Sequence, residues 1–132
     1  MSLLDMWKEN QDGIRQKSLH QLLAFAGEGK LADGNACQQE FRKLISEVEL
    51  DVLRCYSSEA LDGEADTPGF PLQDIVNALG IRLGFQVEHG RYRGRQGEPG
   101  HDGLWIDQDT KHSIIVEVKS TSAYPIRLKT IA

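Results

Sequence analysis

The sequence predicts an α/β protein in which a helical N-terminal segment precedes a small sheet flanked by helices. Three observations predict this class. In the first two thirds of the chain, apolar residues recur at intervals of three and four, as on one face of a helix. Three short runs of alternating or β-branched residues follow, which are typical of strands. The chain has 132 residues, enough for one core without disulfides or a structural metal.

Residues 1–62 are predicted to be helical. A first apolar stripe ends at Gly27, and Asn35 is a predicted N-cap with Gln38 as its capping-box partner. Apolar residues then recur at helical spacing as far as Tyr56, which predicts one long amphipathic helix. Such a helix needs a partner, either the rest of this chain or a second copy. In the second case the segment is a homodimerisation element.

A change of character follows the helical segment. Residues 57–70 are acidic and rich in turn formers, and we place a linker at 63–70 within them. Pro71 suits the first turn of a new helix, whose apolar residues repeat until Gly84, a residue suited to a left-handed C-cap. Residues 71–132 are therefore expected to form the α/β part.

Three strands are predicted at 85–89, 104–106 and 112–120. The polar segment 107–111 is short, so the second and third strands are expected to be antiparallel neighbours in a mostly antiparallel sheet. Residues 124–132 resemble the start of a further helix.

Charged residues gather where these strands begin and end. Asp102 precedes the second strand, whereas Glu117 and Lys119 lie two apart on the third and so project to one face. A hairpin turn between these strands returns Asp102 close to Glu117. Two carboxylates, with a backbone carbonyl such as that of Val118, form an oxygen-rich site for Mg²⁺ or Mn²⁺. Such a metal activates water for phosphodiester hydrolysis, and Lys119 is suited to orient that water.

The segments HDGLW and IIVEVKST resemble the PD-(D/E)xK nuclease superfamily, and the resemblance covers residues 71–132. It implies a restriction-endonuclease-like core and metal-dependent cleavage of nucleic acid, DNA rather than RNA. Asp102 and Glu117 match the metal-binding acids of the family, and Lys119 matches its lysine. The helical position that often carries Glu in the family is Gln73 here, an auxiliary catalytic residue by this resemblance.

The family core continues with a full helix and a further strand, so we expect this chain to be one segment of a longer product with a partial core. The alternative function is a catalytically inactive nuclease-fold interaction module that forms a homodimer through its N-terminal helices. In a third interpretation, the acidic N-terminal half covers the basic loop or docks a partner.

Charge is unevenly distributed along the chain. The net charge is −5, but residues 1–79 carry −7 and residues 80–132 carry +2. The overall balance argues against indiscriminate nucleic-acid binding, whereas the C-terminal part is suited to meet a polyanion. Within it, the motif RYRGR predicts phosphate contacts and base stacking, against the alternative of a solvated basic loop. The predicted nucleic-acid-binding residues are Arg91, Tyr92, Arg93 and Arg95.

The sequence indicates a cytoplasmic protein without a membrane segment. No run approaches the ~18 apolar residues of a membrane span, and the N-terminus lacks the pattern of a signal peptide. Cys37 and Cys55 show no metal-binding spacing and fit a reducing compartment.

Overall fold

The computed structural model describes residues 2–62, 69–93 and 100–119. Within these ranges, six helices precede a three-stranded antiparallel sheet of order β1-β2-β3, which confirms the mixed α/β class. No helix in the described ranges is long and apolar enough to cross a membrane. The elements are α1 (Leu3–Glu9), α2 (Gln11–Arg15), α3 (Leu19–Phe25), α4 (Ala36–Glu47), α5 (Leu50–Leu61), α6 (Gly69–Arg82), β1 (Gln86–His89), β2 (Gly103–Ile106) and β3 (Ser113–Val116).

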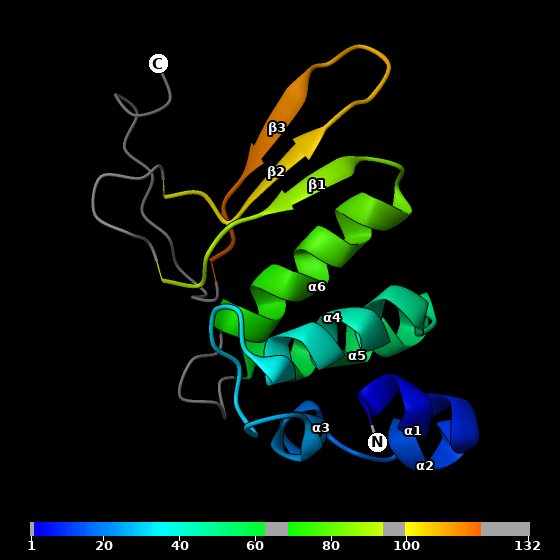
Figure 1. Cartoon of the computed structure of the whole chain (residues 1–132). Coiled ribbons are helices and arrows are strands. Elements are labelled where there is room, and N and C mark those ends of the chain that lie inside the picture. The colour runs from blue at the N-terminus through cyan, green and yellow to red at the C-terminus, as the bar shows by residue number, and fades with distance from the viewer. Residues whose placement is uncertain (1, 63–68, 94–99, 120–132) are drawn as a thin grey trace.

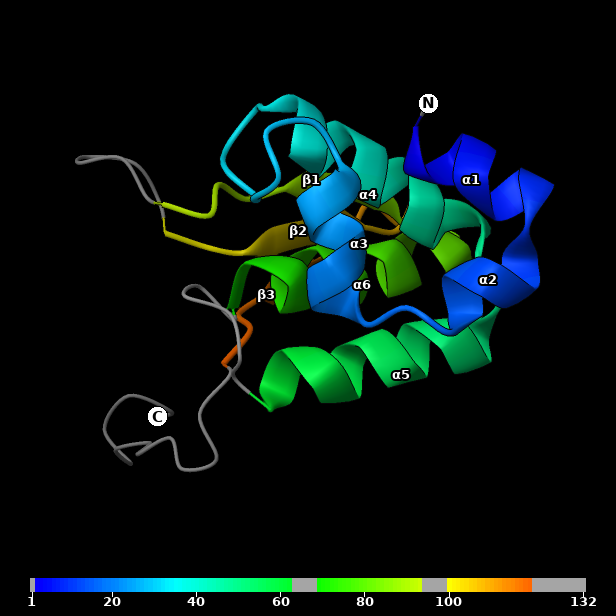
Figure 2. The same ribbon diagram turned by 90° about the horizontal axis from the view of Figure 1, so that it is seen from below.

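Helix α6 lies in the middle of the molecule. One side of it packs against β1 and β2, and the other side packs against α4 and α5 (Figure 1). The short helices α1, α2 and α3 lie beyond α4 and α5, away from the sheet (Figure 2). Because it is covered from both sides, α6 buries most of its residues from Pro71 to Gly80. This central helix contacts β2, which begins directly after Asp102.

One apolar core joins the N-terminal helices to α6. Its fully buried members come from α1, α3, α4, α5 and α6, among them Leu3, Leu22, Phe41, Leu53 and Ile75. The apolar stripe of α4 and α5 thus finds its partner within the same chain. The prediction of homodimerisation through this segment rested on an apolar face without a partner, and that face is buried within the chain.

The single long helix predicted as far as Tyr56 is wrong, because the chain turns between α4 and α5. Val48 and Glu49 adopt extended backbone angles, so the helical hydrogen-bond ladder stops there. Arg82, in the last turn of α6, donates to the carbonyl of Ile45 at 2.9 Å and also to that of Val48. The guanidinium therefore satisfies carbonyls that the end of α4 leaves without intrahelical partners.

Capping is confirmed in part. The side chain of Asn35 accepts a hydrogen bond from the amide of Gln38 at 2.9 Å, as predicted for an N-cap. The reciprocal bond of a capping box is not the one found, because the Gln38 side chain accepts from the amide of Gly34 at 2.8 Å. At the end of α6, Gly84 has a φ of +97°, which confirms the left-handed position expected there.

The boundaries of the α/β part need two corrections. Residues 69–70 belong to α6, so this end of the linker predicted at 63–70 is helical, whereas residues 57–61, although rich in turn formers, belong to α5 within the segment predicted to be helical. The remaining linker residues, 63–68, lie outside the described ranges, as does the helix predicted at 124–132. The third strand ends at Val116 rather than continuing to residue 120.

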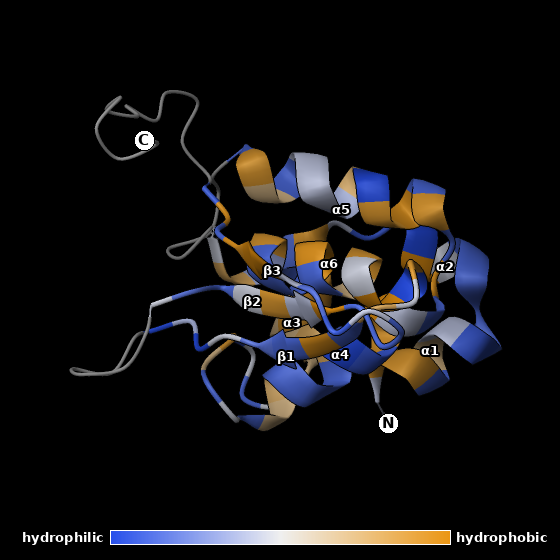
Figure 3. Ribbon diagram, turned by 90° about the horizontal axis from the view of Figure 1, so that it is seen from above, coloured by the Kyte–Doolittle hydropathy of each residue, from blue (hydrophilic) through white to orange (hydrophobic). Residues whose placement is uncertain are grey.

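The sheet itself follows the predicted antiparallel order. Val87 pairs with Trp105, and Trp105 pairs with Ile114, so these three side chains share the face that meets α6. Ile114 and Ile115 are 50% and 68% exposed, and β3 lies at the edge of the described sheet (Figure 3). The β2–β3 hairpin therefore brings its charged ends to an accessible surface.

Candidate active site

Asp102 contacts the end of β3 through both its backbone and its carboxylate. Its amide donates to the carbonyl of Val116 at 3.0 Å, although Val116 already pairs with Gly103. Two residues of one strand thus share one residue of the other, the arrangement of a β-bulge. Asp102 Oδ2 also accepts the amide of Val118 at 2.6 Å. The two bonds therefore join Asp102 to Val116 and Val118, the residues that precede and follow Glu117 in the chain.

Glu117 and Lys119 lie just beyond β3. The Lys119 ammonium lies 3.6 Å from Glu117 Oε2, which shows that both side chains point the same way although the strand has ended. Their side chains are 51% and 43% exposed, so this ion pair by itself contributes little to stability. The structure therefore pairs Glu117 with Lys119 and holds the carboxylate of Asp102 on the Val118 amide, which lies between them in the chain.

The donor set fits a hard divalent cation. The described part of the chain holds no group of three or more His, Cys, Asp and Glu residues arranged to bind a metal. Mg²⁺ does not require such a group, because it is commonly held by one or two carboxylates and keeps several waters. Asp102, Glu117 and the carbonyl of Val118 supply oxygen donors of this kind, and neither Cys nor His competes among them.

Gln73 lies beside Asp102 but faces its backbone. The side chain is buried on α6, and its Nε2 donates to the carbonyls of Gly90 at 3.0 Å, Arg91 at 3.4 Å and Asp102 at 3.2 Å. These bonds tie the end of β1 and the start of β2 to one amide. Gln73 therefore binds the backbone of the candidate site through its side-chain amide, and this amide does not contact the carboxylate of Asp102.

The basic loop is anchored at Tyr92. Its ring stacks on Phe70 with centroids 4.4 Å apart, and its hydroxyl donates to the carboxylate of Asp74. Burial raises the pKa of this phenol, so it remains a hydrogen-bond donor. Asp33 accepts the amides of Tyr92 and Arg93 at 2.7 Å and 3.1 Å. Base stacking by Tyr92 would require its ring to leave this packed position.

The arginines of the loop differ in their surroundings. Arg91 is exposed, and the Arg93 guanidinium lies 5.4 Å from the centre of the Phe70 ring. Arg91 is placed next to Asp102 by the adjacent Gly90, whose amide donates to the carbonyl of Asp102 at 2.9 Å. Arg95 lies outside the described residues.

Sequence reasoning missed a buried charged cluster behind this loop. Asp74 is fully buried on α6, and its Oδ1 lies 3.1 Å from both Nε and Nη2 of Arg42 on α4. Burial raises the pKa of Asp74 to about 6, against the opposing effects of Arg42 and the Tyr92 hydroxyl. The only signal in the sequence is an acidic residue within a helix that is otherwise apolar on several faces.

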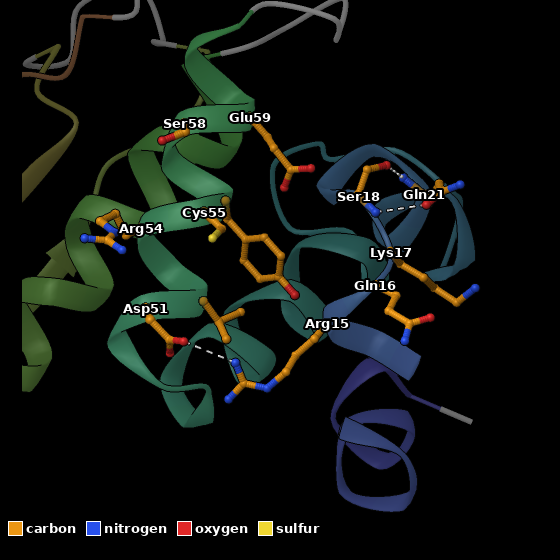
Figure 4. A pocket seen from close by; sticks show the side chains of 12 residues that line it. Arg15, Gln16, Lys17, Ser18, Gln21, Asp51, Arg54, Cys55, Ser58 and Glu59 are labelled. Atoms are coloured by element: carbon orange, nitrogen blue, oxygen red, sulfur yellow. Dashed lines mark hydrogen bonds and ion pairs between the residues drawn. The ribbon is translucent and has the colours of Figure 1, made fainter. Parts of the chain in front are cut away.

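A separate groove lies on the helical side of the molecule. It encloses about 660 Å³ between residues 15–21 and α5, and its lining includes Lys17, Arg54 and Tyr56 (Figure 4). At its edge, Arg15 is held by Glu49 at 2.7 Å and by Asp51 at 3.3 Å. None of the sequence-predicted site residues lines this groove, so it is distinct from the charged end of the hairpin.

Comparison with known proteins assigns no family. No protein-family model, no curated protein and no solved structure matches the chain. The described residues build a mixed α/β fold in which the carboxylate of Asp102 accepts the amide of Val118, between the exposed ion pair of Glu117 and Lys119.

Proposed function

We propose that this chain is a metal-dependent nuclease of the PD-(D/E)xK type, which hydrolyses phosphodiester bonds of DNA. One observation carries the proposal. The carboxylate of Asp102 contacts the amide of Val118, which stands between Glu117 and Lys119. Asp, Glu and Lys are the three residue types that the chemistry requires, and this contact supports their convergence from the start of β2 and the end of β3. The order of α6 followed by three antiparallel strands supports a restriction-endonuclease-like core.

Each residue has a distinct role in this proposal. Asp102, Glu117 and the carbonyl of Val118 hold Mg²⁺ or Mn²⁺. The bound ion would polarise the scissile phosphate and lower the pKa of a coordinated water. Lys119 orients the attacking water and offsets charge that develops on the phosphate, and its ion pair with Glu117 keeps it beside the metal ligands. Arg91 contacts phosphates along the strand.

The test is cleavage of supercoiled and of single-stranded DNA with Mg²⁺ or Mn²⁺. We expect Asp102→Ala and Lys119→Met each to lower the cleavage rate about 100-fold or more, because each removes a group that acts on the reacting phosphate or water. Asp109→Asn is the matched control, since Asp109 is an exposed carboxylate in the turn at the opposite end of the same hairpin. Equal cleavage by all four proteins would refute the proposal.

Calorimetric titration with Mn²⁺ separates binding from catalysis. Saturable binding should disappear in Asp102→Ala but persist in Lys119→Met, because the ammonium is not a metal ligand. Binding without cleavage of any nucleic acid would favour the alternative of an inactive nuclease-fold interaction module. In that alternative, the apolar stripe of the N-terminal helices is not available as a dimer interface, because it is buried within the chain.

A further inference from the structure

The carbonyl oxygen of Asp102 is the meeting point of three donors. It accepts the amide of Gly90 at 2.9 Å, Nδ2 of Asn77 at 3.0 Å and Nε2 of Gln73 at 3.2 Å. Asn77 and Gln73 lie one turn apart on α6, so both point to the same side of the helix. A carbonyl in an ordinary ladder receives one such bond. The backbone of Asp102 is therefore fixed from the helix as well as from the neighbouring strands.

The orientation of the Asn77 amide is set by its two partners. The indole Nε1 of Trp105 only donates, so the Asn77 oxygen must face it, at 3.0 Å. The Asp102 carbonyl only accepts, so the Asn77 nitrogen must face that oxygen. Asn77 is fully buried, which makes an unpaired donor or acceptor there costly.

Gly103 shows how closely the helix approaches this turn. A Cβ added at Gly103 would come within 2.1 Å of Asn77 Oδ1. Three residues of the motif HDGLW therefore contact the Asn77 side chain. Asp102 accepts from it through its carbonyl, Gly103 leaves space for it, and Trp105 donates to it.

We infer that Asn77 and Gln73 are positioning residues for the Asp102 carboxylate. By fixing the Asp102 backbone, the two amides place its Oδ2 on the amide of Val118 and so bring this carboxylate to the segment that carries Glu117 and Lys119. Neither side chain is assigned a contact with metal or substrate. The consequence for metal affinity rests on the proposed function, whereas the consequence for the Val118 amide does not. Residues that orient metal ligands in this way typically change affinity 10–100-fold when altered.

The experiment follows hydrogen exchange of the Val118 amide by NMR in the full chain. Asp102→Ala supplies the reference for an unprotected amide. Asn77→Leu removes the donor to Asp102 and also the partner of Trp105. Trp105→Phe is the matched control, because it removes the indole donor but leaves the bond from Asn77 to Asp102. Gln73→Met, which keeps the length of the side chain without its donor, is the second variant and decides the question if Asn77→Leu fails to fold.

We expect Val118 in Asn77→Leu and Gln73→Met to exchange at least about tenfold faster than in the parent and to approach Asp102→Ala, with Trp105→Phe unchanged. Parental protection of Val118 in a folded Asn77→Leu or Gln73→Met protein overturns the inference. So does an equal loss in Trp105→Phe, because the effect would then come from general loosening of α6 against the sheet.

Mn²⁺ titration of the same proteins distinguishes this inference from the proposed function. If the parent binds Mn²⁺, its affinity should fall about 10–100-fold in Gln73→Met and stay unchanged in Trp105→Phe. If the parent binds none, the proposed function fails, yet the exchange of Val118 still decides whether the helix positions the carboxylate.

Discussion

Replacing Asp74 by Asn should remove a pH dependence that burial imposes on the stability of the fold. The carboxylate is fully buried, and its pKa in the folded state is about 6, above the 3.8 of an unperturbed Asp. Between these values the folded state binds more protons than the unfolded state, so stability is lost as the pH rises from about 4 through 6. The difference between the two pKa values corresponds to about 3 kcal/mol in the free energy of unfolding.

The contribution of Asp74 to the pH dependence of stability must be distinguished from that of neighbouring groups. The guanidinium of Arg42 and the hydroxyl of Tyr92 both favour the ionised form, while the charge of Asp33 opposes it. Asp74 and His89 line one small cavity beside Arg42. His89 is otherwise exposed, and desolvation on its cavity side lowers its pKa to about 4. Its contribution has the opposite sign, since a depressed His pKa costs stability as the pH falls below 6.5.

The assay is therefore a difference between two proteins. Urea unfolding of the parent and of Asp74→Asn at pH 4, 5, 6 and 7 gives the free energy of unfolding of each. The parent should lose about 2 kcal/mol relative to the variant across this range, because part of the full effect is already lost at pH 4. Arg42→Met should make the loss larger, because it removes the charge that lowers the pKa of Asp74. A parent that gains stability relative to Asp74→Asn as the pH rises would refute the reasoning, since Arg42 and Tyr92 would then outweigh burial.

Three further outcomes follow from single contacts. Gly103→Ala should lower the free energy of unfolding by about 2 kcal/mol, because its Cβ would come within 2.1 Å of Asn77 Oδ1; urea denaturation that leaves the midpoint unchanged would contradict this contact. Arg82→Met should cost about 2 kcal/mol through the carbonyls it leaves unpaired at the end of α4, with Arg54→Met, an exposed arginine of α5, as the control in thermal unfolding. In the native protein, a thiol reagent should modify exposed Cys55 but not buried Cys37, whose pKa burial raises to about 11; mass spectrometry showing both modified at equal rates would disprove the burial.

The parts of the fold that the sequence predicts are those with local signals. Pro71 and Gly84 mark the ends of α6 because their effects on the backbone act within a few residues. The alternation of Gln86 to His89 gives β1, and the short polar segment after Ile106 gives the β2–β3 hairpin. In each case the information lies within one turn or one strand.

The parts that it does not predict depend on distant partners. Nothing in the sequence around Val48 interrupts a helix, and the carbonyls freed there are satisfied by Arg82, which is 34 residues away. The packing of Tyr92 depends likewise on Asp33 and Phe70. Asn77 gives no signal as an isolated residue, although Gly103 and Trp105 form the other half of its contacts. The spacing of apolar residues predicts which face of a helix is buried, but it does not identify the distant side chains that pack against that face.

Side chains from each half of the chain bind groups of the other half across the boundary that the sequence places between residues 62 and 71. Arg42 on α4 pairs with Asp74 on α6, Arg82 on α6 binds the carbonyls at the end of α4, and Asp33 holds the amides of the basic loop. The two halves are thus built as complementary fragments. Chain cleavage within 63–68 should leave them associated, and they should elute together as one native species in gel filtration. The basic loop would then be assembled only when both fragments are present.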